Sequence, residues 1–137
     1  MNQITNAQRA LWMVLITSLA APFFASLADV AMTLASPLFD FALPPRGEKP
    51  LGEVAVDAFV WSAFPATFSA LALLPFVLQA GTYSWLHAAI AGVVAFAAAE
   101  FVWPVPPGSA PAVLAFLAGM IAILMRAILI NGGILKP

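Results

Sequence analysis

Cysteine is absent from this 137-residue chain. Its absence excludes disulfides, thiolate nucleophiles, cysteine-based zinc sites and iron–sulfur clusters. Charge is also scarce, because Asp, Glu, Lys and Arg together make up 8% of the residues, against ~25% in soluble domains. The net charge is −1, and no cluster of basic residues is present. We therefore expect no nucleic-acid partner and no cofactor.

Long apolar stretches without any formal charge make up most of the sequence. They cover residues 10–28, 58–99 and 101–125. One bilayer crossing takes about 20 apolar residues, so the middle stretch is long enough for two crossings. The sequence therefore predicts an all-α integral membrane protein, in which four transmembrane helices form one compact antiparallel bundle over residues 1–137.

Residues that end or begin helices divide the chain into four spans, at about 11–32, 54–79, 83–103 and 110–130. A proline-rich loop, 36–53, separates the first two spans. Gly81 suits a helix end and Thr82 the cap of the third span, and this short connection makes spans two and three antiparallel neighbours. We expect Ser109 to cap the fourth span and the Asn-Gly-Gly sequence at 131–133 to end it.

The first span could be mistaken for a signal peptide. Arg9 precedes an apolar run, and Ser18-Leu19-Ala20 resembles a cleavage site. Hydrophobicity continues past that point to about Leu34, which favours a transmembrane span that is retained in the protein.

The four tryptophans are predicted to anchor the bundle at the two membrane surfaces. Trp12 and Trp85 fall at one surface of the predicted bundle, and Trp61 and Trp103 fall toward the other. Two opposed aromatic belts are typical of membrane-spanning helices.

Basic residues indicate the orientation. Arg9, Arg126 and Lys136 lie on the side of the two termini, and Arg46 and Lys49 lie on the opposite side. Because cytoplasmic loops carry more Lys and Arg, this small excess predicts that both termini are cytoplasmic. The alanine-rich, lysine-poor composition suggests a bacterial source, and hence the inner membrane.

Small residues recur on one face of each span: Ser18, Ala21, Ala25 and Ala28; Ser62, Ala66 and Ser69; Ala88, Gly92, Ala95 and Ala99; Ala112, Ala115, Gly119 and Ala122. In lipid, such faces let helix backbones approach closely. We therefore expect a tightly packed bundle whose centre leaves little space for a substrate within one protomer. The alternative is that alanine is simply common in this chain.

Three carboxylates, Asp29, Asp57 and Glu100, are predicted at one membrane level, on the side of the proline-rich loop. A carboxylate costs ~2.5–3.5 kcal/mol at the bilayer centre and less near the surface, so solvation at the interface explains all three. The alternative is a mouth that binds a cation or a proton. Glu100 lies about 100° from the small-residue face of its span, so it can face a partner.

Arg126 continues the small-residue face of the fourth span, one turn from the helix end. Its side chain could snorkel to the membrane surface, or hold a lipid headgroup or a partner's carboxylate. His87 is the only histidine and is predicted at the surface opposite the carboxylates. A lone histidine there is more typical of an interface anchor than of a metal or haem ligand.

Motifs for catalysis are missing. The sequence has no glycine-rich phosphate loop, no HExxH, no paired acids in mid-membrane and no nucleophile beside a base. We therefore expect a non-enzymatic accessory or structural subunit that packs with other membrane subunits or with itself. The alternative is a small oligomeric transporter or channel for a cation or proton, with the three carboxylates as its site. A membrane enzyme that uses His87 is the third possibility.

In length and number of spans the chain is similar to small multidrug resistance transporters and to fluoride channels. The first family carries a carboxylate in the middle of its first span, whereas this span has none before Asp29. The glycine and arginine signature of the second family is missing. The sequence therefore indicates membership of neither family.

Overall fold

A computed structural model describes residues 4–35, 50–104 and 111–137 of the chain. The described residues form four helices, α1 (Asn6–Ala35), α2 (Leu51–Ala80), α3 (Trp85–Val102) and α4 (Pro111–Asn131). All four are long and apolar enough to cross a membrane. The prediction of an all-helical protein with four antiparallel spans is confirmed, and we treat the chain as an integral membrane protein.

The first two helices are longer than the predicted spans. Helix α1 continues to Ala35, and α2 already begins at Leu51, where the backbone N–H groups of Glu53 and Val54 both donate to the carbonyl of Pro50. The predicted ends came from apolarity and helix-breaking residues, whereas the helices of the structure extend beyond the apolar segments. The rest of the proline-rich loop, 36–49, and the predicted cap Ser109 lie outside the described residues.

The turn between α2 and α3 confirms one predicted helix signal and corrects another. Gly81 has a φ of 74° and its N–H donates to the carbonyl of Val77, as expected of a left-handed helix end. The cap of α3 is Ser84, whose Oγ accepts the N–H of His87, so the prediction of Thr82 was wrong. Tyr83 is buried in the turn, which delays the start of α3 by two residues.

The end of α4 also follows its predicted signal. The helix stops at Asn131, and Gly133 has a φ of 76°. The N–H groups of Ile134 and Leu135 then both donate to the carbonyl of Leu129. The chain thereby reverses and places Leu135, which is 1% exposed, beneath the helices.

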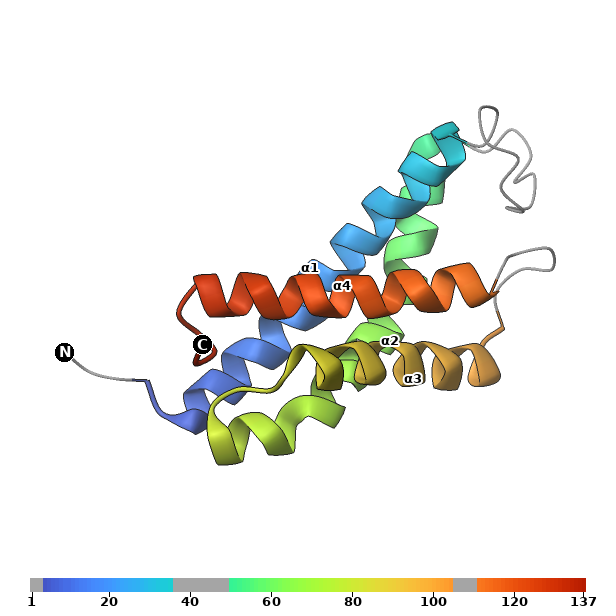
Figure 1. Ribbon diagram of the computed structural model, residues 1–137. Helices are drawn as coiled ribbons and strands as arrows, with labels where there is room; N and C mark the ends of the chain where they lie inside the picture. The colour runs from blue at the N-terminus through green and yellow to red at the C-terminus, as the bar shows by residue number, and fades with distance from the viewer. Residues whose placement is uncertain (1–3, 36–49, 105–110) are drawn as a thin grey trace.

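Two helical hairpins make up the bundle, and they cross one another in Figure 1. The long hairpin consists of α1 and α2, which have 30 residues each, and the short hairpin of α3 and α4, with 18 and 21. In the long hairpin, Ser26 Oγ donates to the carbonyl of Ala55 at 2.8 Å. In the short hairpin the backbones almost touch, because a Cβ on Gly92 would lie 2.8 Å from the carbonyl oxygen of Ala118.

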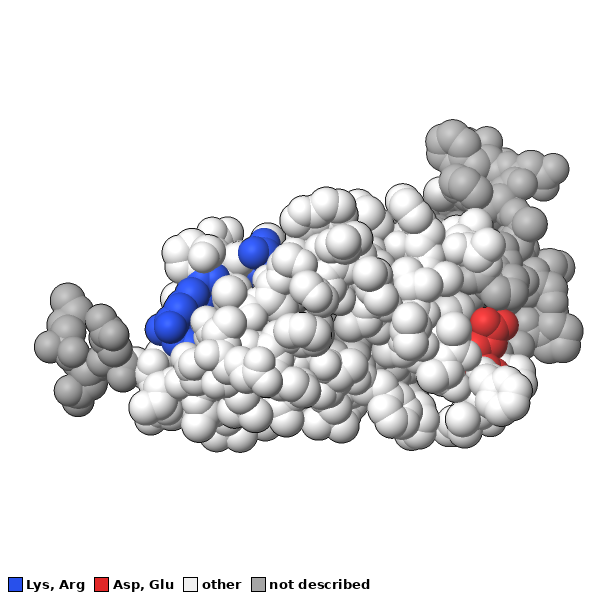
Figure 2. All heavy atoms as spheres, turned by 60° about the horizontal axis from the view of Figure 1, so that its bottom comes forward, with Lys and Arg blue, Asp and Glu red and all other residues white. Residues whose placement is uncertain are grey.

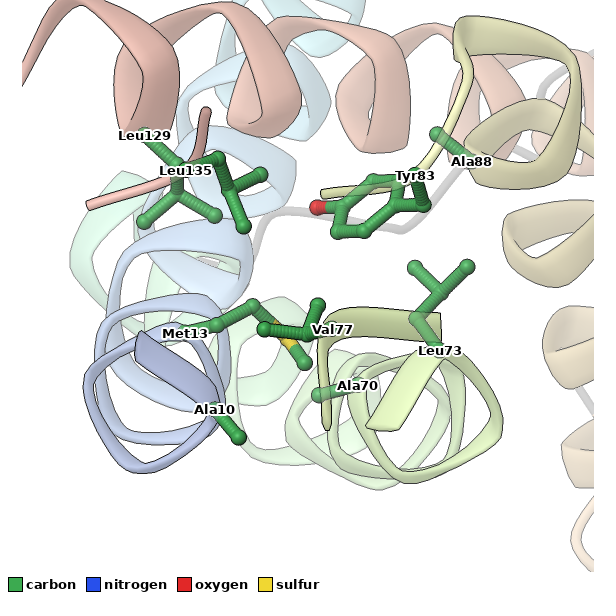
Figure 3. Packing of buried hydrophobic residues seen from close by; sticks show 9 residues of the cluster. All are labelled: Ala10, Met13, Ala70, Leu73, Val77, Tyr83, Ala88, Leu129 and Leu135. Carbon is green, nitrogen blue, oxygen red and sulfur yellow. The ribbon is translucent and has the colours of Figure 1, made fainter. Parts of the chain in front are cut away.

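The two ends of the bundle differ. The end that holds both termini is called the closed end. There the hairpins are in contact through one cluster of buried side chains (Figures 1 and 3). This cluster contains Ala10, Met13, Ala70, Leu73, Val77, Tyr83, Ala88, Leu129 and Leu135. Toward the opposite end, which we call the wide end, the hairpins diverge (Figure 1).

Proline residues lie inside both helices of the long hairpin. Helix α2 contains Pro65 and Pro75, and α1 contains Pro22, which is fully buried. Each removes a helical N–H donor and disturbs the preceding turn. Helix α2 changes direction along its length (Figure 1), as expected of a helix with two internal prolines.

Large apolar side chains cover the outside of the bundle. They come from every helix and include Leu19, Phe23, Val60, Phe68, Ile90, Val94, Phe116 and Met120. Exposed apolar surface of this extent is unfavourable in water and favourable in hydrocarbon. Contact with a lipid bilayer therefore follows from the fold.

Candidate functional site

A cleft of about 860 Å³ separates the two hairpins, and all four helices contribute to its walls. The expectation that the centre of the bundle leaves little space for a substrate was therefore wrong. The physical reason is the crossing of the hairpins: packing at the closed end holds them together, and their divergence leaves the rest of the interface unfilled.

The predicted small-residue faces differ in what they contact. In α3 the predicted face is packed, since Ala88, Gly92, Ala95 and Ala99 are all buried. In the long hairpin the predicted faces border the cleft, through Ala21, Ala25 and Ala28 of α1 and Ser62, Ala66 and Ser69 of α2. A small-residue face marks where close approach is possible, and the crossing angle decides whether a helix of the same chain takes that place.

Two of the three predicted carboxylates lie in this cleft. Asp29, which is 6% exposed, and Asp57, which is exposed, both line it. Glu100 is half-buried and is not among the described lining residues. The fold therefore brings Asp29 and Asp57 to one space, which their separation of 28 positions in the sequence does not reveal.

Aromatic side chains form the wall next to Asp57. Trp61 follows Asp57 by one helical turn, and its Nε1 donates to the backbone carbonyl of Trp103 at 3.1 Å. The ring of Trp61 packs against that of Phe96, with centroids 5.3 Å apart. Trp61 and Trp103 were predicted at the same membrane surface, and the fold places them together; nothing in the sequence singled out Phe96.

The contact between Trp61 and Trp103 also locates Asp57 relative to the short hairpin. Trp103 directly follows α3, so residues that precede Trp61 in α2 lie beyond the end of the short hairpin. Helix α3 is about 27 Å long, close to the ~30 Å of a bilayer's hydrocarbon. Asp57 consequently lies near this end of the short hairpin, which we call the mouth of the cleft.

The closed end carries the basic residues of the described chain, Arg9, Arg126 and Lys136. Arg9 Nη1 donates to the carbonyl of Ile134 at 2.7 Å, and the N–H of Lys136 donates to the carbonyl of Gly81 at 3.1 Å. Figure 2 shows Lys and Arg at one end of the visible face and Asp and Glu at the other.

Arg126, predicted to snorkel or to hold a headgroup or a partner, lies on the turn between α2 and α3. Its Nε donates to the backbone carbonyl of Tyr83. Burial raises the pKa of the Tyr83 phenol to about 12, and the nearby Arg126 cation offsets part of that rise. Arg126 thus joins the closed end and is remote from the cleft mouth.

The remaining predicted residues lie on the surface near the closed end. His87 is exposed, with its Nδ1 2.6 Å from Ser84 Oγ and its ring against Phe76. Trp12 and Trp85 are exposed as well. Within the described ranges, no group of three or more His, Asp or Glu side chains could hold a metal ion.

The cleft can therefore hold a ligand. It is open and largely apolar, and its mouth is acidic. No family model, no curated protein and no solved structure matches the chain. Only the geometry of the described residues therefore indicates a function.

Proposed function

We propose that this chain is a small membrane transporter or channel that receives a cation or a proton at the cleft mouth. One observation supports this choice above the others: a cleft of about 860 Å³ between the hairpins, with Asp29 and Asp57 in its wall. The accessory role expected from the sequence rests on the missing catalytic motifs and the small-residue faces. The cleft gives the transport alternative a specific site.

The placement of the carboxylates supports a cation or a proton as the ligand. Asp29 is almost fully buried in the cleft wall, and Asp57 is exposed in the same wall. Carboxylates within membrane helices are commonly found on ion and proton pathways. No chemical change of the substrate is part of this proposal, so the protein is proposed to be non-enzymatic.

Passage to the other side requires more than one rigid protomer. Met13, Leu129 and Leu135 fill the closed end, each with at most 1% exposure. A path must therefore run between protomers, or open when the hairpins move relative to each other. We propose an oligomer, for which the apolar outer faces of the helices provide the contact surface.

The proposal is tested by flux into liposomes that contain the purified protein. Asp29→Asn and Asp57→Asn should each abolish or strongly reduce uptake of protons or monovalent cations, because they remove a charge from the cleft. Glu100→Gln is the matched control and should leave the flux unchanged, since Glu100 does not line the cleft. Absence of flux in the unmodified protein, or equal loss in all three variants, would contradict the proposal.

An accessory subunit remains the second candidate, and a specific observation favours it. The small-residue faces of α1 and α2 border the cleft, where a transmembrane helix of a partner could pack. The cysteine-free chain allows single-cysteine crosslinking: Ala66→Cys should form a crosslink to a partner protein in native membranes, and Ala72→Cys, on the exposed side of the same helix, should not. Equal crosslinking at both positions would remove this candidate.

The orientation is proposed from charge. The described basic residues Arg9, Arg126 and Lys136 all lie at the closed end, which supports a cytoplasmic location for that end and for both termini. A bacterial inner membrane is proposed on the composition. Accessibility of cysteines introduced at Thr5 and at Gly52 to an impermeant thiol reagent in intact cells tests the orientation, because only Gly52→Cys should react from outside.

A further inference from the structure

Three basic residues from the two ends of the sequence gather on two turns at the closed end. Arg9 and Arg126 each donate to a backbone carbonyl there. The N–H of Lys136 donates to the carbonyl of Gly81, which joins the turn after α4 to the turn after α2. The Lys136 side chain lies along this second turn, since its Cε is 2.9 Å from the position that a Cβ on Gly81 would take. The fold thus holds three cations in one region.

The acidic side chains of the described residues lie toward the other end of the helices. Asp29 follows Arg9 by about 30 Å of helix. Glu53 and Asp57 lie in the first two turns of α2, and Glu100 lies in the last turn of α3. Figure 2 shows the same separation of charge on the visible face. In the described part of the chain, no Asp or Glu side chain is therefore close enough to neutralise the three cations.

The guanidinium groups keep donors that the carbonyl contacts do not use. Each guanidinium has five N–H donors. The contacts of Arg9 with backbone carbonyls involve only Nη1, and that of Arg126 involves only Nε. Arg9 Nε is buried without a hydrogen-bond partner, so the charge of this group is incompletely compensated. A guanidinium that is held at one nitrogen and has further N–H groups is suited to the oxygens of a phosphate.

Exposed apolar side chains lie on the membrane side of these cations. Trp12 is exposed one turn after Arg9 in α1, and Leu78 is exposed one turn before Gly81 in α2. All four helices begin or end at the closed end (Figure 1), so in a bilayer this end meets the headgroup layer on one side. A ligand there would find positive charge beside an apolar surface. This pairing matches an anionic amphiphile better than a free ion.

We propose that the closed end is a binding site for a phospholipid whose headgroup carries a net negative charge. The phosphate lies among Arg9, Arg126 and Lys136, and the acyl chains follow the exposed side chains of Trp12 and Leu78 toward the bilayer centre. Because Arg9 belongs to the long hairpin and the other two cations to the short one, the lipid joins the hairpins. The site lies at the opposite end from the cleft mouth, and the inference is independent of the proposed function.

Lipid titration of the full chain in micelles of an uncharged detergent tests the site. Native mass spectrometry measures the lipid that is bound, and the melting temperature measures stabilisation. We expect phosphatidylglycerol to bind at least about tenfold more tightly than phosphatidylcholine with the same acyl chains. It should also raise the melting temperature, because it binds the folded protein. Inorganic phosphate at the same concentration should do neither, since it has no apolar part.

Two single variants and a matched double variant locate the site. Lys136→Gln, at an exposed position, should lower the affinity for phosphatidylglycerol about fivefold, as expected for one basic residue. Lys136→Arg keeps the charge and should keep the affinity. Lys136→Gln/Glu53→Gln restores the net charge of the protein, but it should not restore the affinity, because Glu53 is at the other end of α2.

The arginines are tested together. Arg9→Gln/Arg126→Gln should abolish the difference in affinity between the two lipids, and circular dichroism establishes whether this variant is folded. If it is not folded, the Lys136 variants decide the question, because that side chain is exposed.

Three results would overturn the inference. The first is equal affinity for the two lipids in the unmodified protein. The second is recovery of the affinity in Lys136→Gln/Glu53→Gln, which would show that the net charge of the protein and not the closed end selects the lipid. The third is displacement of phosphatidylglycerol by an equal concentration of inorganic phosphate, which would identify a site for a soluble anion.

Discussion

The closed end and the wide end of this bundle consist of the same four helices, yet they differ in almost every physical respect. Large side chains such as Met13, Leu129 and Leu135 fill the closed end, and backbone carbonyls there receive hydrogen bonds from Arg9 and Arg126. At the wide end, small, acidic and aromatic side chains are among those that line a cleft between the hairpins.

The comparison shows where this fold obtains its stability and where it keeps room for a ligand. Lipid tails are as apolar as a leucine side chain, so helices in a membrane gain from close packing and from hydrogen bonds rather than from burial as such. Between the two hairpins, both gains are concentrated at the closed end. Near the wide end, a hydrogen bond from Trp61 to the Trp103 carbonyl joins the two hairpins.

The largest expected difference between the two ends concerns methionines on one helix. Met13→Ala should lower the free energy of unfolding by about 3 kcal/mol, because Met13 is 0% exposed and its removal leaves a cavity. Met32→Ala, at the cleft wall of the same helix, should cost less than about 0.5 kcal/mol. Reversible unfolding in mixed micelles measures both, and equal losses would contradict the distinction between the ends.

Close backbone contact in the short hairpin gives the next largest effect. Gly92→Ala should destabilise the protein by about 2 kcal/mol, because the new Cβ would lie 2.8 Å from the carbonyl oxygen of Ala118 and 2.9 Å from Cβ of Ala122. Gly52→Ala is the control, since nothing lies within 4 Å of its Cβ position. If both substitutions were equally harmless in the same unfolding assay, the helices would be packed less closely than described.

A pH effect is expected at the closed end. The folded pKa of Tyr83 is raised to about 12, above the ordinary value of about 10, so the neutral phenol is favoured by folding. Stability should be unaffected below pH 10 and should fall as the pH rises from 10 through 12, by about 1.4 kcal/mol at pH 11.

Tyr83 is the only tyrosine, so phenolate absorbance reads this group directly. Arg126→Gln should shift the titration to still higher pH, because the Arg126 cation lowers the pKa of the phenol. A midpoint near 10 in the folded protein would show that the closed end admits water.

The smallest expected energetic effect belongs to the wide end. Trp61→Phe keeps an aromatic ring against Phe96 but removes the hydrogen bond to Trp103, for a loss of about 1 kcal/mol. Its larger consequence should be geometric, because this bond joins the two hairpins near the cleft mouth.

Spin-label distances distinguish a local loosening of this kind from general loosening. Labels at Val56 and Val113, both exposed and near the wide end, should show a broader distance distribution in Trp61→Phe. Labels at Leu11 and Leu86, exposed near the closed end, should show no change. Broadening of both pairs would indicate that the closed end does not hold the hairpins independently.

Several elements of the fold could be predicted because their signals are local. Charge-free runs marked the spans, since each crossing depends on its own apolarity, and Gly81 and Gly133 marked helix ends, since only a residue without a side chain readily adopts a positive φ. The cap of α3 was missed because Thr82 and Ser84 are both suitable caps. The burial of Tyr83 between hairpins, a tertiary contact, decides in favour of Ser84.

The candidate site was predicted only in part. Asp29 and Asp57 were singled out by their charge, and Trp61 and Trp103 by their position near one surface. Which helix faces turn toward each other determines the cleft that contains these residues. It also determines that Phe96 is part of the described wall and that Glu100 is not. Residues far apart in the sequence supply these faces, so no single stretch carries the information.

By itself, the sequence determined that this chain is in the membrane, that it crosses four times as antiparallel helices, and where most of those helices end. Hydrogen bonds within each helix and the transfer of each apolar segment to lipid are local free energies, which single segments carry. Only the tertiary structure decided that the two hairpins cross, that the closed end is filled and that the small residues of α1 and α2 border a cleft. In lipid, exposed and packed apolar surfaces differ little in energy, so the crossing angle follows from side-chain fit and a few hydrogen bonds across the whole bundle.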